Sequence, residues 1–125
     1  MIRLGAGLVC AAIAGMAAAQ DIAVPSGAEI ALMEVVLEEA PAIARFRFLV
    51  PAIGGGLSFS DVAADFAVLC DDYALPALEA QQVQVEAIVI SMSSRQIALG
   101  EIDPATPQFF EQFRPENGTC IWEKF

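Results

Sequence analysis

The stretch Glu29-Ile30-Ala31-Leu32-Met33-Glu34-Val35-Val36-Leu37-Glu38, followed after four residues by Ile43-Ala44-Arg45-Phe46-Arg47-Phe48-Leu49-Val50, decides the fold. Apolar and charged side chains alternate in both segments, and a period of two is typical of strands with one buried face. If 39–42 is the loop, position 35 lies opposite 46, 33 opposite 48 and 34 opposite 47. Apolar pairs then share one face and Glu34 meets Arg47 on the other, which predicts an antiparallel hairpin.

A helix is predicted after this hairpin. Ser58-Phe59-Ser60-Asp61 has the pattern of a capping box, in which the serine hydroxyl and the acid three residues later satisfy two backbone N–H groups. The apolar residues that follow repeat at helical spacing, and Pro76 is expected to end the element. This apolar stripe consists of Val62, Phe66, Leu69, Cys70 and Tyr73.

The remaining segments predict two strands, a second helix and a last strand. Residues 83–92 are rich in β-branched side chains, and 96–102 is expected to return beside them. Asp103-Pro104 is a helix start signal, and the phenylalanines at 109, 110 and 113 would share one helical face. Asn117-Gly118 is typical of a tight turn, so 119–122 is expected to be a strand with Cys120 and Trp122 facing inward.

Together these elements have the order ββαββαβ. Strands joined by short turns favour an antiparallel sheet, and helices that follow hairpins favour packing on one face of it. The predicted fold class is therefore α+β, with an antiparallel sheet of about five strands and two helices on one face.

The first nineteen residues have the three parts of a secretory signal peptide. A basic start at Arg3 precedes the apolar run 4–14, and Ala17-Ala18-Ala19 supplies small residues for cleavage. Residues 4–19 would make a helix of about 24 Å, shorter than the roughly 30 Å hydrocarbon core, so no stable membrane span is expected after cleavage. We predict cleavage after Ala19, a single domain over 20–125 and a periplasmic location.

The charge balance excludes some partners. The chain has six basic and sixteen acidic residues, a net charge of −10, which becomes −11 if Arg3 leaves with the leader. Such a charge repels phosphate backbones, so we expect no binding to nucleic acid.

Two of the three cysteines, Cys70 and Cys120, lie in the predicted mature chain. An even number of cysteines in an exported protein is typically disulfide-bonded, and two cysteines allow a single intramolecular pairing. The alternative is a reactive or metal-binding thiol pair, which the missing C-x-x-C spacing and the absence of histidine disfavour.

The chain lacks the residues for several kinds of catalysis. Without histidine it has no Ser-His-Asp or Cys-His site, and its one lysine, Lys124, lies next to the C-terminus. Carboxylates remain, and the candidate pairs for metal or partner contact are Asp61 with Asp65 and Asp71 with Asp72. The alternative is that these acids lie on a solvated helix surface. Asp71 and Asp72 are expected near a helix C-terminus, where acids are electrostatically disfavoured. No cofactor motif is present, and we expect no cofactor.

The sequence also resembles a known family. The C-terminal segment 106–122, the hairpin residues Arg45-Phe46-Arg47-Phe48 and the pair Leu69-Cys70 are similar to those of small exported alphaproteobacterial proteins defined as a domain of unknown function. The resemblance spans nearly the whole predicted mature chain. It implies no activity and no functional residues.

Two hypotheses follow for the function. The first is a periplasmic, non-enzymatic binding or accessory module with one disulfide, acting with an envelope or periplasmic protein. The alternative is a carboxylate-based hydrolase or a divalent-metal-binding protein that uses the aspartates named above.

Overall fold

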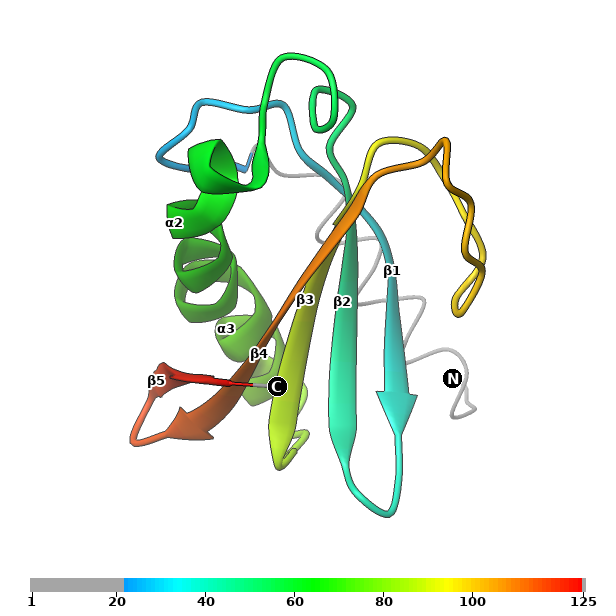
Figure 1. The fold of residues 1–125 in the computed structure, drawn as a ribbon. Coiled ribbons are helices and arrows are strands. Elements are labelled where there is room, and N and C mark those ends of the chain that lie inside the picture. The colour runs from blue at the N-terminus through cyan, green and yellow to red at the C-terminus, as the bar shows by residue number, and fades with distance from the viewer. Residues whose placement is uncertain (1–21, 125) are drawn as a thin grey trace, which may run out of the picture.

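The computed structural model describes residues 22–124, so the predicted leader and its cleavage point lie outside the described residues. Five strands form one sheet in the spatial order β1-β2-β3-β4-β5 (Figure 1). A helical run separates the second strand from the third. The elements are β1 (Ala31–Glu38), β2 (Ile43–Leu49), α2 (Phe59–Leu69), the π-helical turn η1 (Cys70–Ala74), α3 (Leu75–Ala80), β3 (Ala87–Ser93), β4 (Gln108–Glu116) and β5 (Thr119–Glu123).

The hairpin of β1 and β2 has the predicted loop and most of the predicted register. Val35 pairs with Phe46 and Glu34 pairs with Arg47, on either side of the turn at 39–42. Val35 and Phe46 belong to the core, and Arg47 forms an ion pair with Glu34 on the opposite face. The two faces of the hairpin are therefore confirmed.

The register prediction was wrong at Met33. Phe48 pairs with Leu32, because a β-bulge between Leu32 and Glu34 inserts one extra residue into β1. The bulge allows Leu32 and Val35 to lie in the same core, although residues three apart in a regular strand face opposite sides. In a regular strand without the bulge, strict alternation of side chains would place Met33, rather than Leu32, in the core opposite Phe48.

The first helix begins as predicted. The Ser58 backbone N–H donates to the Asp61 carboxylate at 2.8 Å, and the Asp61 N–H donates to the Ser58 hydroxyl at 3.4 Å. Val62, Phe66 and Leu69 are buried against the sheet, so the predicted apolar stripe is confirmed.

The sequence predicts that the helix ends at Pro76, but the helix continues past this residue. It continues through η1 into α3, and the whole helical run covers 22 residues. Pro76 directly follows the π-helical turn, where the Leu75 N–H bonds to the Cys70 carbonyl oxygen and the regular i→i−4 pattern is already interrupted. The π-helical turn just before it allows the run to continue and to bury Leu78.

The sheet is mixed, and the prediction of an antiparallel sheet was wrong. β2 and β3 run parallel, with Ile43 opposite Ala87 and Leu49 opposite Ser93. The helical run between them carries the chain back along the sheet, so β3 starts at the same end as β2. All seven residues of β3 are buried, because this central strand is covered on both faces.

The predicted strand at 96–102 is a loop that extends to residue 107, and the rest of the predicted second helix, 108–114, lies in strand β4. β4 pairs with β3 in antiparallel register, with Ile88 opposite Phe113 and Met92 opposite Phe109. Phe109 and Phe113 suit a helix and a strand equally well, since both periods place residues four apart on one face. Pairing with β3 decides for the strand, and Phe110 then faces away from the core.

The last hairpin is confirmed, with one correction. Asn117 and Gly118 have φ values of 53° and 80°, the left-handed geometry of a two-residue turn. Cys120 is half-buried at β5, but the Trp122 side chain is 56% exposed and donates its indole N–H to Glu111 at 2.7 Å. The predicted inward position of Trp122 was wrong because β5 is the sheet edge, where the packed layer ends.

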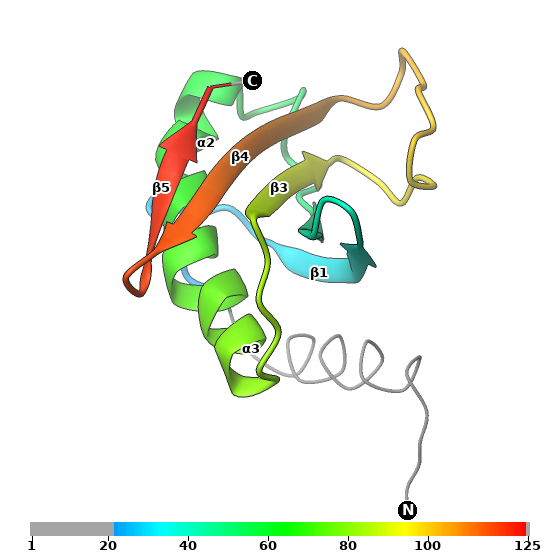
Figure 2. The same ribbon diagram turned by 90° about the horizontal axis from the view of Figure 1, so that it is seen from below.

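The molecule has a helical layer on one face of the sheet and an irregular loop on the other. Figure 2 shows the helical run and the loop after β3 on opposite sides of the strands. Between 22 and 124, no helix has the length and apolar character needed to cross a membrane. The largest fully buried side chains include Phe46, Phe48, Phe66, Ile88 and Ile90.

Candidate functional site

The two cysteines are joined, as predicted. Cys70 at the start of η1 and Cys120 in β5 form a disulfide with a Cα–Cα distance of 6.1 Å. The neighbouring Asp71 carboxylate accepts the Cys120 backbone N–H at 2.8 Å. The disulfide and this hydrogen bond together attach the edge strand to the helical run.

Asp61 and Asp65 have separate structural partners. The Ser58 backbone N–H holds the pKa of the exposed Asp61 carboxyl below its usual value, and the Ser58 hydroxyl adds to this. Asp65 is fully buried, so the alternative of a solvated helix surface is wrong for this residue. Its carboxylate accepts the Ser26 backbone N–H at 3.0 Å and the Ser26 hydroxyl at 2.5 Å, because the segment before β1 crosses over the helix.

The four predicted aspartates do not form a metal centre in the described part of the chain. Asp71 bonds to β5, and Asp72 is an exposed residue of η1. No group of three or more histidine, cysteine, aspartate or glutamate side chains that could hold a metal ion occurs among residues 22–124. Asp61, Asp65 and Asp71 therefore accept hydrogen bonds from the protein itself, whereas Asp72 is exposed.

A hollow lies instead on the face of the sheet opposite the helices. It has a volume of about 650 Å³ and lies between strands β1 to β4 and the loop 94–107. We call it the sheet hollow. Its lining consists of Glu38, Arg45, Arg47, Val89, Ser91, Leu99, Gly100, Glu101, Ile102, Asp103, Thr106, Gln108 and Phe110. The volume falls within the range of about 300–1,000 Å³ that is typical of small-molecule sites.

The loop over the hollow is attached to the sheet by Arg47. This buried guanidinium forms an ion pair with Glu34 of β1 and donates to the Ile97 carbonyl oxygen at 2.6 Å. A buried charge is costly unless it is paired and hydrogen-bonded, and Arg47 is both. Its side chain therefore fixes one end of the loop above β2.

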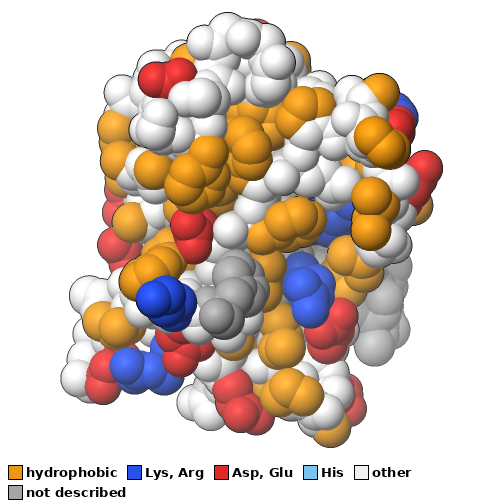
Figure 3. Space-filling model, in the orientation of Figure 1, with side chains coloured by type: hydrophobic (Ala, Val, Ile, Leu, Met, Phe, Trp, Pro, Cys, Tyr) orange, Lys and Arg blue, Asp and Glu red, His pale blue; other side chains and the backbone are white. Residues whose placement is uncertain are grey.

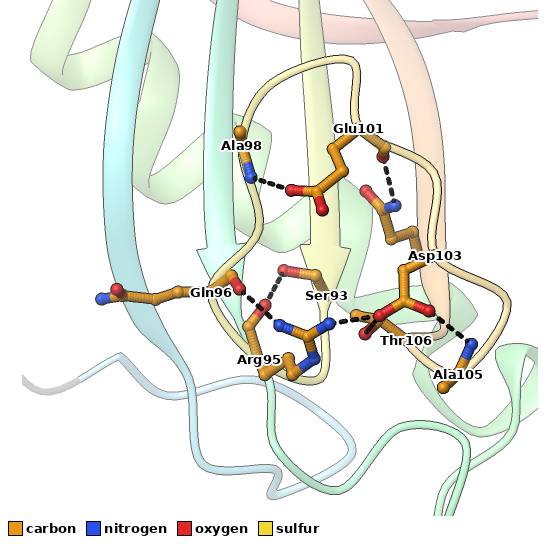
Figure 4. Close-up of polar contacts among 9 residues, drawn as sticks. Ser93, Arg95, Gln96, Ala98, Glu101, Asp103, Ala105 and Thr106 are labelled. Carbon is orange, nitrogen blue, oxygen red and sulfur yellow. Dashed lines mark hydrogen bonds and ion pairs between the residues drawn. The ribbon is translucent and has the colours of Figure 1, made fainter.

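The loop is also held by contacts within itself. Arg95 forms an ion pair with Asp103, and the Ala98 backbone N–H donates to the Glu101 carboxylate at 3.1 Å (Figure 4). Asp103 accepts the Ala105 N–H and the Thr106 hydroxyl, each at 3.0 Å. The Ala105 N–H is the main reason that the pKa of the Asp103 carboxyl lies below its usual value, and the bonds from Arg95 and Thr106 add to it.

The end of this loop, at Pro107, packs against a glycine in the connection that follows β2. Gly54 has a φ of +80°, and a Cβ atom at this position would overlap the ring of Pro107. Only glycine combines this left-handed backbone with so close an approach. The connection after β2 and the end of the loop are thereby packed together.

The walls of the hollow expose apolar side chains. Leu99 and Ile102 come from the loop and Phe110 from β4, and Ile102 is 88% exposed. Figure 3 shows hydrophobic side chains on the surface of the loop and of the strands beside it. Val89 forms part of the floor and is buried.

Two polar groups of the hollow, the Arg45 guanidinium and the Ser91 hydroxyl, have hydrogen-bonding atoms without a partner in the described chain. Arg45 donates its Nε–H to Glu38 at 3.0 Å, and within the described chain its guanidinium has no second partner. Ser91 is 7% exposed, and its hydroxyl has no hydrogen-bond partner among residues 22–124. The predicted pairing of Arg47 with Glu34 is confirmed, and Arg45 pairs with a second hairpin glutamate, Glu38.

The relationship to other proteins agrees with the resemblance noted above. A model described as "Family of unknown function (DUF6497)" matches residues 8–125. The chain belongs to the DUF6497 family. Neither the curated proteins nor the solved structures contain a match to it. The family of unknown function predicted from the sequence is thus confirmed, whereas its exported and alphaproteobacterial character stays a prediction.

Sequence reasoning did not find the hollow of this DUF6497 protein. The alternation of Arg45 and Arg47 with buried residues showed that β2 has a polar second face. However, 96–102 was interpreted as a strand and 103–114 as a helix, so no segment was left to cover that face. The useful signal is the series of turn-forming residues Ser94, Gly100, Asp103 and Pro104, which are typical of loops.

Proposed function

We propose that this protein is an exported, non-enzymatic binding module and that its ligand site is the sheet hollow. The observation that carries the proposal is a hollow of about 650 Å³ whose exposed surface is mostly apolar, although charged and polar side chains also line it. Ligand sites are typically concave and mostly apolar, with a few polar groups that orient the ligand. The bonds from Arg47 and within the loop hold the loop over the sheet and so maintain the hollow.

Export is supported by the sequence. The basic, apolar and small-residue parts of 1–19 are typical of a cleavable leader, and a disulfide is typical of oxidising compartments. An accessory role towards an envelope protein is consistent with this location. The hydrolase or metal-binding alternative has less support, since Asp61, Asp65 and Asp71 each have a hydrogen-bond partner within the protein.

The proposal is tested with N-phenyl-1-naphthylamine, an uncharged probe that fluoresces in apolar surroundings. We expect saturable binding to the wild-type protein. Phe110→Glu should weaken this binding roughly tenfold or more, since burying a phenylalanine side chain contributes about 1.5–3 kcal/mol and 1.4 kcal/mol corresponds to a factor of ten. The measurement is a fluorescence titration.

The matched control is Ile121→Glu. Ile121 is an exposed apolar residue of the neighbouring strand β5 and does not line the hollow. Its substitution should leave the affinity for the probe unchanged. Equal weakening by both substitutions, or no saturable binding to the wild-type protein, would contradict the proposal.

A further inference from the structure

The hydrogen-bonding groups of the sheet hollow indicate the chemistry of its ligand. We infer that the hollow binds a small amphipathic carboxylate, with the carboxylate held by Arg45 and Ser91 and the apolar part lying against Leu99, Ile102 and Phe110. This inference rests on the function proposed above and adds the ligand class.

The first observation is the Ser91 hydroxyl. Buried polar groups in folded proteins nearly always have a hydrogen-bond partner, and an exception requires an explanation. Ser91 lies on the central strand β3 and lines the hollow between Arg47 of β2 and Phe110 of β4, its partners in the sheet register. Its hydroxyl is thus positioned to bond to a molecule in the hollow.

The second observation is the guanidinium of Arg45. An arginine side chain has five N–H donors, and the Nε–H is the one that bonds to Glu38. The side chain of Arg45 is 31% exposed, so its terminal nitrogens remain accessible from the hollow. Two parallel N–H groups of arginine match the two oxygens of a carboxylate, which makes this the preferred partner.

The register places these two donors near each other. Arg45 pairs with Val89, and Ser91 is the next residue of β3 on the same face. Neighbouring strands are about 4.8 Å apart and each residue advances about 3.3 Å along a parallel strand, so the two Cα atoms are about 8 Å apart, within reach of a long side chain such as arginine. One carboxylate can therefore accept hydrogen bonds from both residues.

The acids of the hollow do not favour a cationic ligand. Glu38 is paired with Arg45, and Asp103 is paired with Arg95. Glu101 accepts the Ala98 backbone N–H. The overall charge of −10 disfavours anions at long range, but this field is screened over about 8 Å at physiological ionic strength, so the local donors determine the preference.

The apolar walls account for the rest of the ligand. Leu99 and Phe110 are each 48% exposed, and Ile102 is exposed even further. An apolar ligand body that covers these side chains removes hydrocarbon surface from water. A small anion without such a body would leave the walls uncovered.

The test is isothermal titration calorimetry of the whole predicted mature chain, residues 20–125, with decanoate, decanol and decylammonium. These probes share a ten-carbon chain and differ in the polar group. We expect decanoate to bind at least tenfold more tightly than decanol, and decylammonium to bind most weakly. Arg45→Gln should remove the advantage of decanoate over decanol, and Ser91→Ala should reduce it several-fold. Arg114→Gln, which removes the same charge from an exposed arginine outside the hollow, should change neither affinity.

The outcomes separate the inference from the proposed function. Equal affinity for decanoate and decanol, or tighter binding of decylammonium, overturns the carboxylate preference and leaves the hollow as a binding site. A decanoate advantage that persists in both Arg45→Gln and Ser91→Ala also overturns it, because the selectivity then arises elsewhere. No binding of any alkyl probe contradicts the proposed function as well.

Discussion

At the scale of single residues, Asp65 shows how a charged side chain can belong to the interior. Its carboxylate accepts two hydrogen bonds from Ser26, and the Ser26 hydroxyl in turn accepts the Ala28 N–H at 3.0 Å. These bonds hold the segment before β1 against the helix. Asp65 is therefore structural, although its residue type and spacing from Asp61 suggested a surface site.

We predict that Asp65→Ala destabilises the protein by about 1–3 kcal/mol, because it leaves the partly buried N–H and hydroxyl donors of Ser26 without an acceptor. The measurement is the free energy of unfolding in urea. The control is Asp72→Ala, an exposed residue of the same helical run, which should change stability by no more than about 0.5 kcal/mol. Equal losses of stability for the two substitutions would show that the contact between Asp65 and Ser26 does not contribute to the free energy of unfolding.

At the scale of elements, the loop 94–107 depends on the ionised form of Asp103. Its carboxyl has a pKa below the ordinary value of 3.8 in the folded protein. A group with a lowered folded pKa contributes stability that is present above its unfolded pKa and is lost as the pH falls through the folded pKa. This contribution is therefore complete above about pH 4 and decreases at lower pH.

We predict that wild type is more stable than Asp103→Asn near pH 6 and that this difference shrinks as the pH falls below 3.8. Urea unfolding of both proteins between pH 6 and pH 3 measures it. Arg95→Gln should retain most of the pH dependence, because the Ala105 N–H is the largest cause of the lowered pKa. A difference that is constant with pH, or that grows on acidification, would contradict this explanation.

The other elements show why some sequence patterns were reliable. The capping box at Ser58 and the turn at Asn117-Gly118 act within a few residues, and both were predicted. Phe109 and Phe113 fit either a helix or a strand, and the choice depends on pairing with the distant strand β3. Local signals cannot contain that information.

At the scale of the whole molecule, the disulfide links the sheet edge to the helical layer. Cys70 and Cys120 are 50 residues apart in the sequence. Closing a loop of this length lowers the entropy of the unfolded chain, with a contribution of about 4 kcal/mol. The same bond connects the stability of the fold to an oxidising compartment.

We predict that Cys120→Ser lowers the free energy of unfolding by about 4 kcal/mol. Adding a reductant should destabilise wild type by a similar amount and leave Cys120→Ser unchanged, as urea unfolding with and without reductant would show. The wild-type protein is best isolated from the periplasm, where we expect a chain that begins at Gln20. A chain that begins at Met1 and carries free thiols would contradict both the export and the role of the disulfide.

By itself, the sequence determined the local features of this protein. The two faces of the first hairpin, the start of the helix, the last turn and the single pairing of two cysteines all follow from residue type and short spacing. The fold class was accessible for the same reason, since burial patterns repeat within each element.

The tertiary structure alone decided the parallel pairing of β2 with β3, the strand character of β4 and the sheet hollow. Each depends on contacts between segments that are distant in the sequence, such as Arg47 with the Ile97 carbonyl 50 residues away. The hollow exists because the helical run covers one face of the sheet and leaves the other to a loop. The physical reason is that a binding surface arises from the packing of elements, whereas periodicity reports the preferences of each element separately.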